Sequence, residues 1–145
     1  MVRTTIDPAL QQLATKVFRR GLLNYDRRHG FRGATARIDL NGDYKDALKK
    51  TVLPAGAEKS WQKAVVLSAG AAEARIETES GKQGTIGLKS LAWARKALKD
   101  QRVREAPKKA SDVLAKGDVI YVEEAKNGAF ELRQVPNVEG AMVVM

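Results

Sequence analysis

Residues 7–22 carry the clearest periodic pattern in the chain. Asp7 can accept hydrogen bonds from the free amides of a first helical turn, and Pro8 suits the first helical position because it has no amide to satisfy. The apolar side chains that follow recur at three- and four-residue steps, which predicts an amphipathic helix that packs on another surface. They are Leu10, Leu13, Ala14, Val17, Phe18 and Leu22. A short strand is expected at 4–6 and an arginine-rich loop at 24–33.

In the second half of the chain the helical period gives way to the alternating period of strands. Asn127 and Gly128 are typical of a two-residue hairpin turn, and Gly84 and Gly87 indicate a bend or bulge within one strand. A helical or irregular crossing at 88–98 separates the third predicted strand from the fourth. We expect strands at 62–68, 72–79, 83–88, 119–122 and 129–135. This order predicts a mainly β fold with some α, in the form of a five-stranded OB-like barrel.

The pattern divides the chain into three parts. Residues 1–50 are expected to be a linker with a short strand, a helix, the arginine-rich loop and a short helix, and residues 51–135 the OB-like domain. Residues 136–145 begin another apolar strand, whose most economical partner is the strand at 4–6. The barrel is therefore interpreted as an insert between an N-terminal strand-helix and a C-terminal strand of a neighbouring domain. Self-association through these terminal segments is also expected.

The net charge of the chain bears on the kind of partner it binds. The 145 residues carry a net charge of +9, of which +6 falls within residues 1–50. A positive balance favours an anionic partner, and an OB barrel with a basic groove can bind single-stranded nucleic acid. The concentration of charge outside the barrel strands and the small number of aromatic residues argue against that interpretation. No apolar run is long enough for a membrane span or a signal peptide, and no cysteine is available for disulfides or zinc.

No arrangement of side chains predicts catalysis. Ser68 and Ser90 both lack the lysine three residues later that a Ser-x-x-Lys nucleophile needs. Three glutamates on one face of the predicted strand at 72–79 are expected to face solvent rather than bind a metal: Glu73, Glu77 and Glu79. We expect no catalytic residue, no cofactor and no metal in this chain.

The loop at 24–33 brings an acid, a histidine and several arginines close together in sequence. Proton transfer by such a group is possible in principle. The simpler interpretation is that Asp26 forms a local ion pair with Arg27 or Arg28, and that His29 is a turn residue.

Four segments resemble class A penicillin-binding proteins, at 4–11, 19–33, 110–120 and 138–144. The Tyr-Asp-Arg-Arg-His-Gly motif, which begins at Tyr25, is the most specific of them and is closely similar to the 1A group of Gram-negative bacteria. The segment at 110–120 is similar to a late strand of that family's OB-like insert. The segment at 138–144 is similar to the first strand of its transpeptidase domain. The resemblance extends over the whole chain.

The resemblance implies that the parent protein is a bifunctional peptidoglycan synthase, with glycosyltransferase and DD-transpeptidase activities in cell-wall biosynthesis and cell shape. That parent would be anchored in the inner membrane and would act in the periplasm. The family's catalytic glutamates and its Ser-x-x-Lys serine lie outside this chain, so the chain itself is expected not to be an enzyme.

For this chain the resemblance implies the OB-like domain, also called the outer-membrane docking domain. Its expected role is regulatory: it binds an outer-membrane lipoprotein activator and contacts the remainder of the parent enzyme. The alternative is a single-stranded nucleic-acid-binding OB-fold protein. The candidate partner-binding residues are Lys82, Lys89, Trp93, Arg95, Lys96, Arg102 and Arg104.

Overall fold

The computed structural model describes residues 7–98, 103–125 and 127–141. Its first element is the helix that Asp7 and Pro8 predict. In α1 (Pro8–Arg28) the Asp7 carboxylate accepts hydrogen bonds from the amides of Ala9 at 2.8 Å and Leu10 at 3.3 Å. The helix continues to Arg28, so the first five residues of the predicted loop at 24–33 are helical. Two arginines in the last turn favour that extension because they complement the helix dipole.

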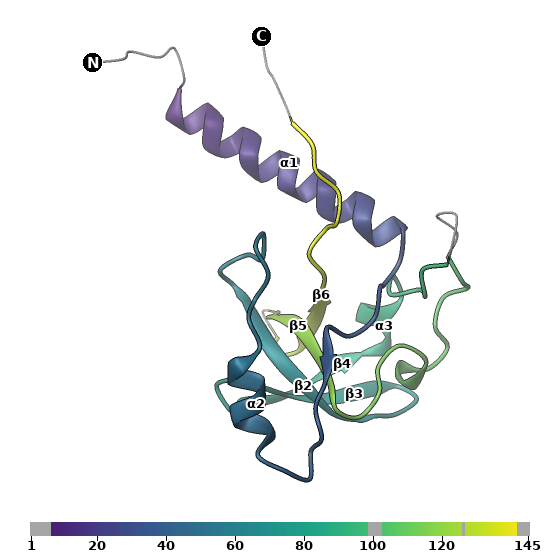
Figure 1. The fold of residues 1–145 in the computed structure, drawn as a ribbon. Helices are drawn as coiled ribbons and strands as arrows, with labels where there is room; N and C mark the ends of the chain where they lie inside the picture. Colours follow the sequence, from purple (N-terminus) through teal and green to yellow (C-terminus); the bar gives the residue numbers. More distant parts are fainter. Residues whose placement is uncertain (1–6, 99–102, 126, 142–145) are drawn as a thin grey trace.

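The sheet is antiparallel throughout, in the order β1-β5-β2-β3-β4, with β6 paired to β5 (Figure 1). All five predicted strands are present to within two residues at each end, and the short β1 is an additional sixth. The hairpin turn at Asn127 and Gly128 joins β5 to β6, as predicted. The strands are β1 (Ala36–Arg37), β2 (Trp61–Ala69), β3 (Glu73–Thr78), β4 (Gln83–Gly87), β5 (Asp118–Glu124) and β6 (Phe130–Arg133).

Three short helices complete the part of the fold that the structure describes. α2 (Tyr44–Lys50) confirms the short helix expected near the end of the first third of the chain. The crossing after β4 contains only one helical turn, α3 (Leu88–Leu91), and continues irregularly. A 3-10 turn, η2 (Ala110–Asp112), precedes β5. The fold class is therefore mainly β with α, and OB-like.

The sheet curves until β4 approaches β6, but within the described residues no ladder of hydrogen bonds joins these two strands. Gly84 lies at this approach, and a Cβ atom added there would overlap the ring of Phe130. Of the bend or bulge predicted at the glycines of β4, the bulge is absent, because the register of β4 with β3 is regular. The irregularity lies in β2, between Val66 and Ser68. The predicted barrel is thus an open, strongly curved sheet.

Both faces of the sheet are covered. The larger cluster of buried apolar side chains lies inside the curve and includes Ile76, Ile86 and Phe130. The smaller cluster lies on the outer face, where Leu48 of α2 packs on Val65 and Val119. Burial on both faces explains why most positions of β2 and β5 are buried, rather than alternately buried and exposed.

Polar contacts fix α2 on the outer face. Glu77 is buried, and its carboxylate accepts hydrogen bonds from Gln83 at 3.0 Å and Tyr44 at 3.4 Å. The hydrogen bond from Gln83, opposed by burial and supported by Lys45 and Tyr44, holds the pKa of Glu77 below its ordinary value. The expectation that Glu77 faces solvent is wrong because α2 covers its end of β3. Lys63 is also buried and pairs with Glu79 at 2.7 Å.

Helix α1 projects away from the sheet, and the outgoing segment 134–141 runs up beside it (Figure 1). Gly140 lies against the ring of Phe18. The predicted apolar stripe is present but largely uncovered, since Leu10, Leu13 and Val17 are 64%, 57% and 56% exposed. The strands predicted at the two ends lie mostly outside the described residues, and 138–141 contain no strand.

The three-part division of the chain stays a prediction. Two elements within the predicted linker 1–50 nevertheless contact the sheet. β1 pairs with β5, through Ala36 opposite Val119, and α2 packs on β2.

Candidate protein-binding surface

The segment that follows α3 folds into a small ribbon beside the end of α1. Phe31 donates its amide to the carbonyl of Arg95 at 2.7 Å, and Ala97 donates to the carbonyl of Phe31 at 3.3 Å. On the other side Arg104 donates its amide to the carbonyl of Lys96 at 3.1 Å. Gly30 allows this approach: its φ is +87°, and a Cβ atom there would overlap the Arg95 carbonyl.

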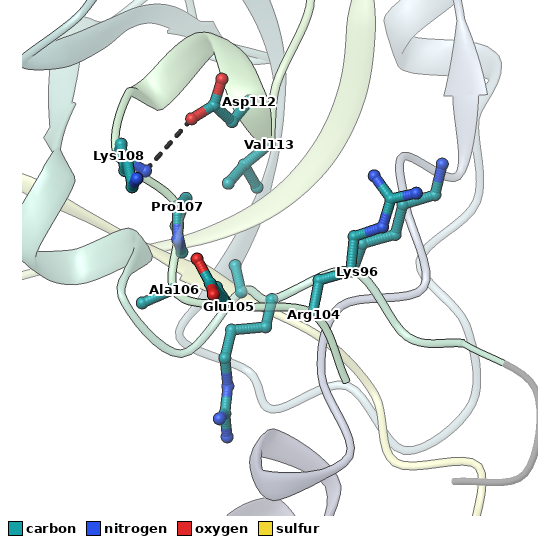
Figure 2. Close-up of a pocket in the computed structure, with 10 residues that line it drawn as sticks. Lys96, Arg104, Glu105, Ala106, Pro107, Lys108, Asp112 and Val113 are labelled. Atoms are coloured by element: carbon teal, nitrogen blue, oxygen red, sulfur yellow. Dashed lines mark hydrogen bonds between the residues drawn. The ribbon is translucent and has the colours of Figure 1, made fainter. Parts of the chain in front are cut away.

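This ribbon and the turn before η2 enclose a cleft of about 470 Å³, which we call the basic cleft. Figure 2 shows Lys96 and Arg104 on one side of it, and Lys108 and Asp112 on the other. Four cations and two acids line the basic cleft. The full lining is Ala94, Arg95, Lys96, Arg104, Glu105, Ala106, Pro107, Lys108, Asp112 and Val113.

The two acids of the basic cleft differ in what they already bind. One oxygen of Asp112 accepts hydrogen bonds from the backbone amides of Lys108 at 3.1 Å and Lys109 at 2.9 Å, which caps η2. Glu105 is exposed and makes no ion pair within the described residues. The basic cleft therefore has an excess of positive charge.

The structure brings together only part of the predicted set. Arg95, Lys96 and Arg104 all line the basic cleft, whereas Lys82 and Lys89 lie at opposite ends of β4. Lys82 is already paired, with its amine 2.5 Å from the Glu124 carboxylate.

Of the remaining two predicted residues, Trp93 is not part of the cleft lining. Trp93 is half-buried, packed edge-on against Phe31 with the Arg27 guanidinium 5.3 Å from its ring. Arg102 lies outside the described residues. Lys108, which completes the four cations, was not among the predicted residues, although it lies within the same basic stretch of sequence.

A second polar cluster was missed by sequence reasoning. Asp26 is buried and pairs with Arg32 at 2.5 Å, not with Arg27 or Arg28. Its other oxygen accepts a hydrogen bond from the Gln134 amide at 2.7 Å. Arg32 also donates to the carbonyl of Val135. We call these contacts the Asp26 latch, because they tie the end of α1 to the outgoing segment.

His29 is the C-cap residue of α1, in agreement with its interpretation as a turn residue. Its Nδ1 lies 2.8 Å from the carbonyl of Tyr25, and its backbone amide returns to the last helical turn. The geometry gives His29 a structural role at the helix end.

Another cleft, of about 430 Å³, lies where β1 and β6 meet the same edge of β5. Its two cations are already engaged: Arg32 in the Asp26 latch, and Arg133 with Glu123 at 2.7 Å. Burial raises the pKa of Glu123, but the hydrogen bonds from Ser60 and Arg133 outweigh it and the pKa is lowered. Burial and the nearby charge of Arg133 lower the pKa of Arg27 in the same region.

No metal-binding group of three or more acidic, histidine or cysteine side chains occurs in the described parts of the chain. Across residues 7–98, 103–125 and 127–141, no helix combines the length and apolarity that crossing a bilayer needs.

The curved antiparallel sheet with a helical crossing after its third long strand is the architecture of an OB-like domain. Over residues 31–138 the sequence matches the penicillin-binding protein OB-like domain family, and the chain belongs to that family. The match begins just after α1 and ends beyond β6, so it contains both the sheet and the basic cleft.

The individual relatives agree with the family. Penicillin-binding protein 1A of Rickettsia typhi is 37% identical over 142 residues, covering 98% of this chain and 17% of that protein. Its counterpart in Pseudomonas aeruginosa is 30% identical over 142 residues, with 98% and 17% covered. The chain therefore spans about a sixth of the length of these relatives. A crystal structure of penicillin-binding protein 1A from Haemophilus influenzae shares the fold, with a TM-score of 0.52 and 23% identity, over 81% of this chain and 16% of that one.

Proposed function

We propose that this chain is the OB-like domain of a penicillin-binding protein 1A, a bifunctional peptidoglycan synthase. Alignment of 98% of the chain with one continuous part of proteins carrying that name supports the proposal. The parent enzyme would polymerise and cross-link peptidoglycan in the periplasm from an inner-membrane anchor.

Within that enzyme the proposed role of the domain is regulatory and non-catalytic: it docks an outer-membrane lipoprotein activator. The observation that carries this proposal is the basic cleft. It gathers Arg95, Lys96 and Arg104 on one side of the domain, and the ribbon that supports it packs on the end of α1. A partner bound there can influence how α1 sits relative to the sheet, and α1 leads away from the sheet (Figure 1).

A direct titration tests the docking role. The 145-residue chain is titrated by calorimetry with the purified soluble portion of the outer-membrane lipoprotein activator from the same organism, and the full-length parent enzyme serves as the positive control. Saturable binding of one lipoprotein per chain is expected. If the full enzyme binds the lipoprotein and this chain does not, the docking role of the domain is overturned.

Single-stranded nucleic acid is the comparison ligand in the same experiment. OB domains bind single strands by stacking bases on exposed aromatic rings. Here Trp61, Tyr121 and Phe130 are buried in the sheet. Only weak, steeply salt-dependent binding to an oligonucleotide is therefore expected, because nonspecific charge is the main contribution left.

A further inference from the structure

We infer that the basic cleft receives an acidic, extended segment of a protein partner. The inference rests on the proposed docking function and specifies where and through what chemistry docking occurs. It follows from three properties of the basic cleft: cations that have no carboxylate partner among the described residues, its size and its exposed backbone.

The cations of the sheet are mostly paired with carboxylates. Ion pairs join Arg37 to Asp118, Lys63 to Glu79 and Lys82 to Glu124. Within the described residues, none of the four cations of the basic cleft has a carboxylate at ion-pair distance. These four are Arg95, Lys96, Arg104 and Lys108. The domain thus neutralises its charge across the sheet and leaves a positive excess here.

The acids inside the basic cleft do not remove that excess. Asp112 is held by the backbone amides that cap η2, and among the described lining residues Asp112 and Glu105 together carry two negative charges against four positive ones. A partner that brings carboxylates of its own gains Coulomb energy here, and such complementarity accelerates association and selects the partner. Arg95 and Arg104 can each hold a carboxylate through two parallel hydrogen bonds.

The size of the basic cleft favours a segment over a folded surface. A volume of about 470 Å³ falls within the range of pockets that enclose a small ligand. A short stretch of extended polypeptide fits that volume, whereas a flat interface needs a much larger area.

The backbone of the cleft also suits an extended partner. After Arg104, whose amide pairs with Lys96, the chain runs on through Glu105 and Ala106. Both residues are exposed, and their amides make no hydrogen bond within the part of the chain that the structure describes. The carbonyls of an extended peptide can accept such bonds, as in other cases of strand addition.

Two synthetic peptides and a pair of double variants test the inference. The probe is a fluorescent ten-residue Glu-Ser repeat, and its uncharged match is a Gln-Ser repeat. The cleft variant is Lys96→Glu with Arg104→Glu. The control variant is Lys50→Glu with Lys59→Glu, which reverses two exposed lysines near α2 and the start of β2. Circular dichroism and thermal melting verify that both variants fold.

In low salt the acidic peptide is expected to bind the unchanged chain and the control variant within twofold of each other. Its affinity for the cleft variant is expected to fall at least about tenfold, because two attractions become repulsions. Raising the salt to about 0.5 M should weaken binding to the unchanged chain as the charges are screened. Equal binding of the acidic peptide to both variants, or equal binding of the two peptides, overturns the inference.

The lipoprotein titration is then repeated with both variants, so that the two proposals can fail separately. Loss of lipoprotein binding in the cleft variant alone supports both proposals. Lipoprotein that binds the cleft variant as well as the unchanged chain keeps the docking role and overturns the basic cleft as its site. Lipoprotein that binds no form of the chain, while the acidic peptide still distinguishes the variants, overturns the docking role and keeps the cleft as a site for acidic segments.

Discussion

At the scale of single residues, Asp26 joins parts of the chain that are far apart in sequence. Its carboxylate binds Arg32, six residues away, and Gln134, which is 108 residues away. Gln134 in turn accepts the Arg32 amide at 2.9 Å and donates to the Gly30 carbonyl at 3.1 Å. The Asp26 carboxylate gives the Arg32 guanidinium and the Gln134 side-chain amide an acceptor in a site where water would not replace it.

Replacing Asp26 should therefore destabilise the fold. For Asp26→Ala we expect a loss of about 2–3 kcal/mol in the free energy of unfolding, because Arg32 and Gln134 are left without their partner in a half-buried site. Urea unfolding at pH 7 measures the loss. The matched control, Glu139→Ala, changes an exposed acid and should stay within about 0.5 kcal/mol of the unchanged chain. A loss of that small size for Asp26→Ala would contradict the latch.

Residue-level interpretation of the sequence failed where partners are distant. Spacing alone favours an ion pair between Asp26 and its neighbours Arg27 or Arg28, and no local pattern points to Gln134. The same limit applies to Lys82, whose partner Glu124 is brought near only by the curvature of the sheet. Three of the seven predicted surface residues do meet at the basic cleft, because they lie on neighbouring parts of one basic segment.

At the scale of elements, periodicity predicted the long strands and α2 but not their neighbours. β1 spans two residues, Ala36–Arg37, too few for any alternation to show. The sequence correctly marked Gly84 as a special position in its strand. The reason for a glycine there is the close packing of Phe130, a residue in another strand. A glycine in a strand is compatible with a bulge, a bend or a close approach, and only the tertiary structure distinguishes these.

The attachment of α2 to β3 predicts an acid-dependent stability. The folded-state pKa of Glu77 lies below its ordinary value, so its stabilising contribution is complete above the unfolded-state pKa of about 4.3 and disappears as the pH falls through the lower, folded-state pKa. We expect Glu77→Gln to lower the free energy of unfolding by about 1–2 kcal/mol at pH 7, because the ionised hydrogen bonds from Gln83 and Tyr44 are weakened.

Denaturant unfolding of both forms at several pH values checks this expectation. The difference between Glu77→Gln and the unchanged chain should shrink as the pH is lowered from about 5 towards 3. Glu73→Gln, an exposed change on the same strand, should show little difference at any pH. A difference for Glu77→Gln that is the same at pH 7 and pH 3 would show that its charge is not involved.

At the scale of the whole molecule, the fold class could be predicted because the hydrophobic pattern indicates the strands along the chain and the position of the crossing between the third and fourth of them. Closure of the sheet could not, since it depends on whether β4 and β6 exchange hydrogen bonds, and no local pattern specifies this. The distribution of charge was also informative. The sheet pairs most of its cations, and the positive excess remains largely on α1 and around the basic cleft.

The exposed apolar stripe on α1 supports a test of the predicted self-association. Leu10, Leu13 and Val17 form an exposed apolar face, and such faces associate when concentrated. Sedimentation velocity at increasing protein concentration should show a rising mean mass for this chain. The variant Leu13→Lys with Val17→Lys should sediment as a monomer at the same concentrations. A monomeric unchanged chain at millimolar concentration would rule the expectation out.

The Asp26 latch has one more consequence, for mechanical force. The chain comes off α1 into the sheet and leaves it beside the same helix, and the latch joins these two crossings at one point (Figure 1). Tension along the polypeptide is therefore carried from α1 through Asp26 and Arg32 into the outgoing segment, and it bypasses the ladders of the sheet. The sheet lies outside this path of force, so it can stay folded while α1, the Asp26 latch and the outgoing segment carry the tension.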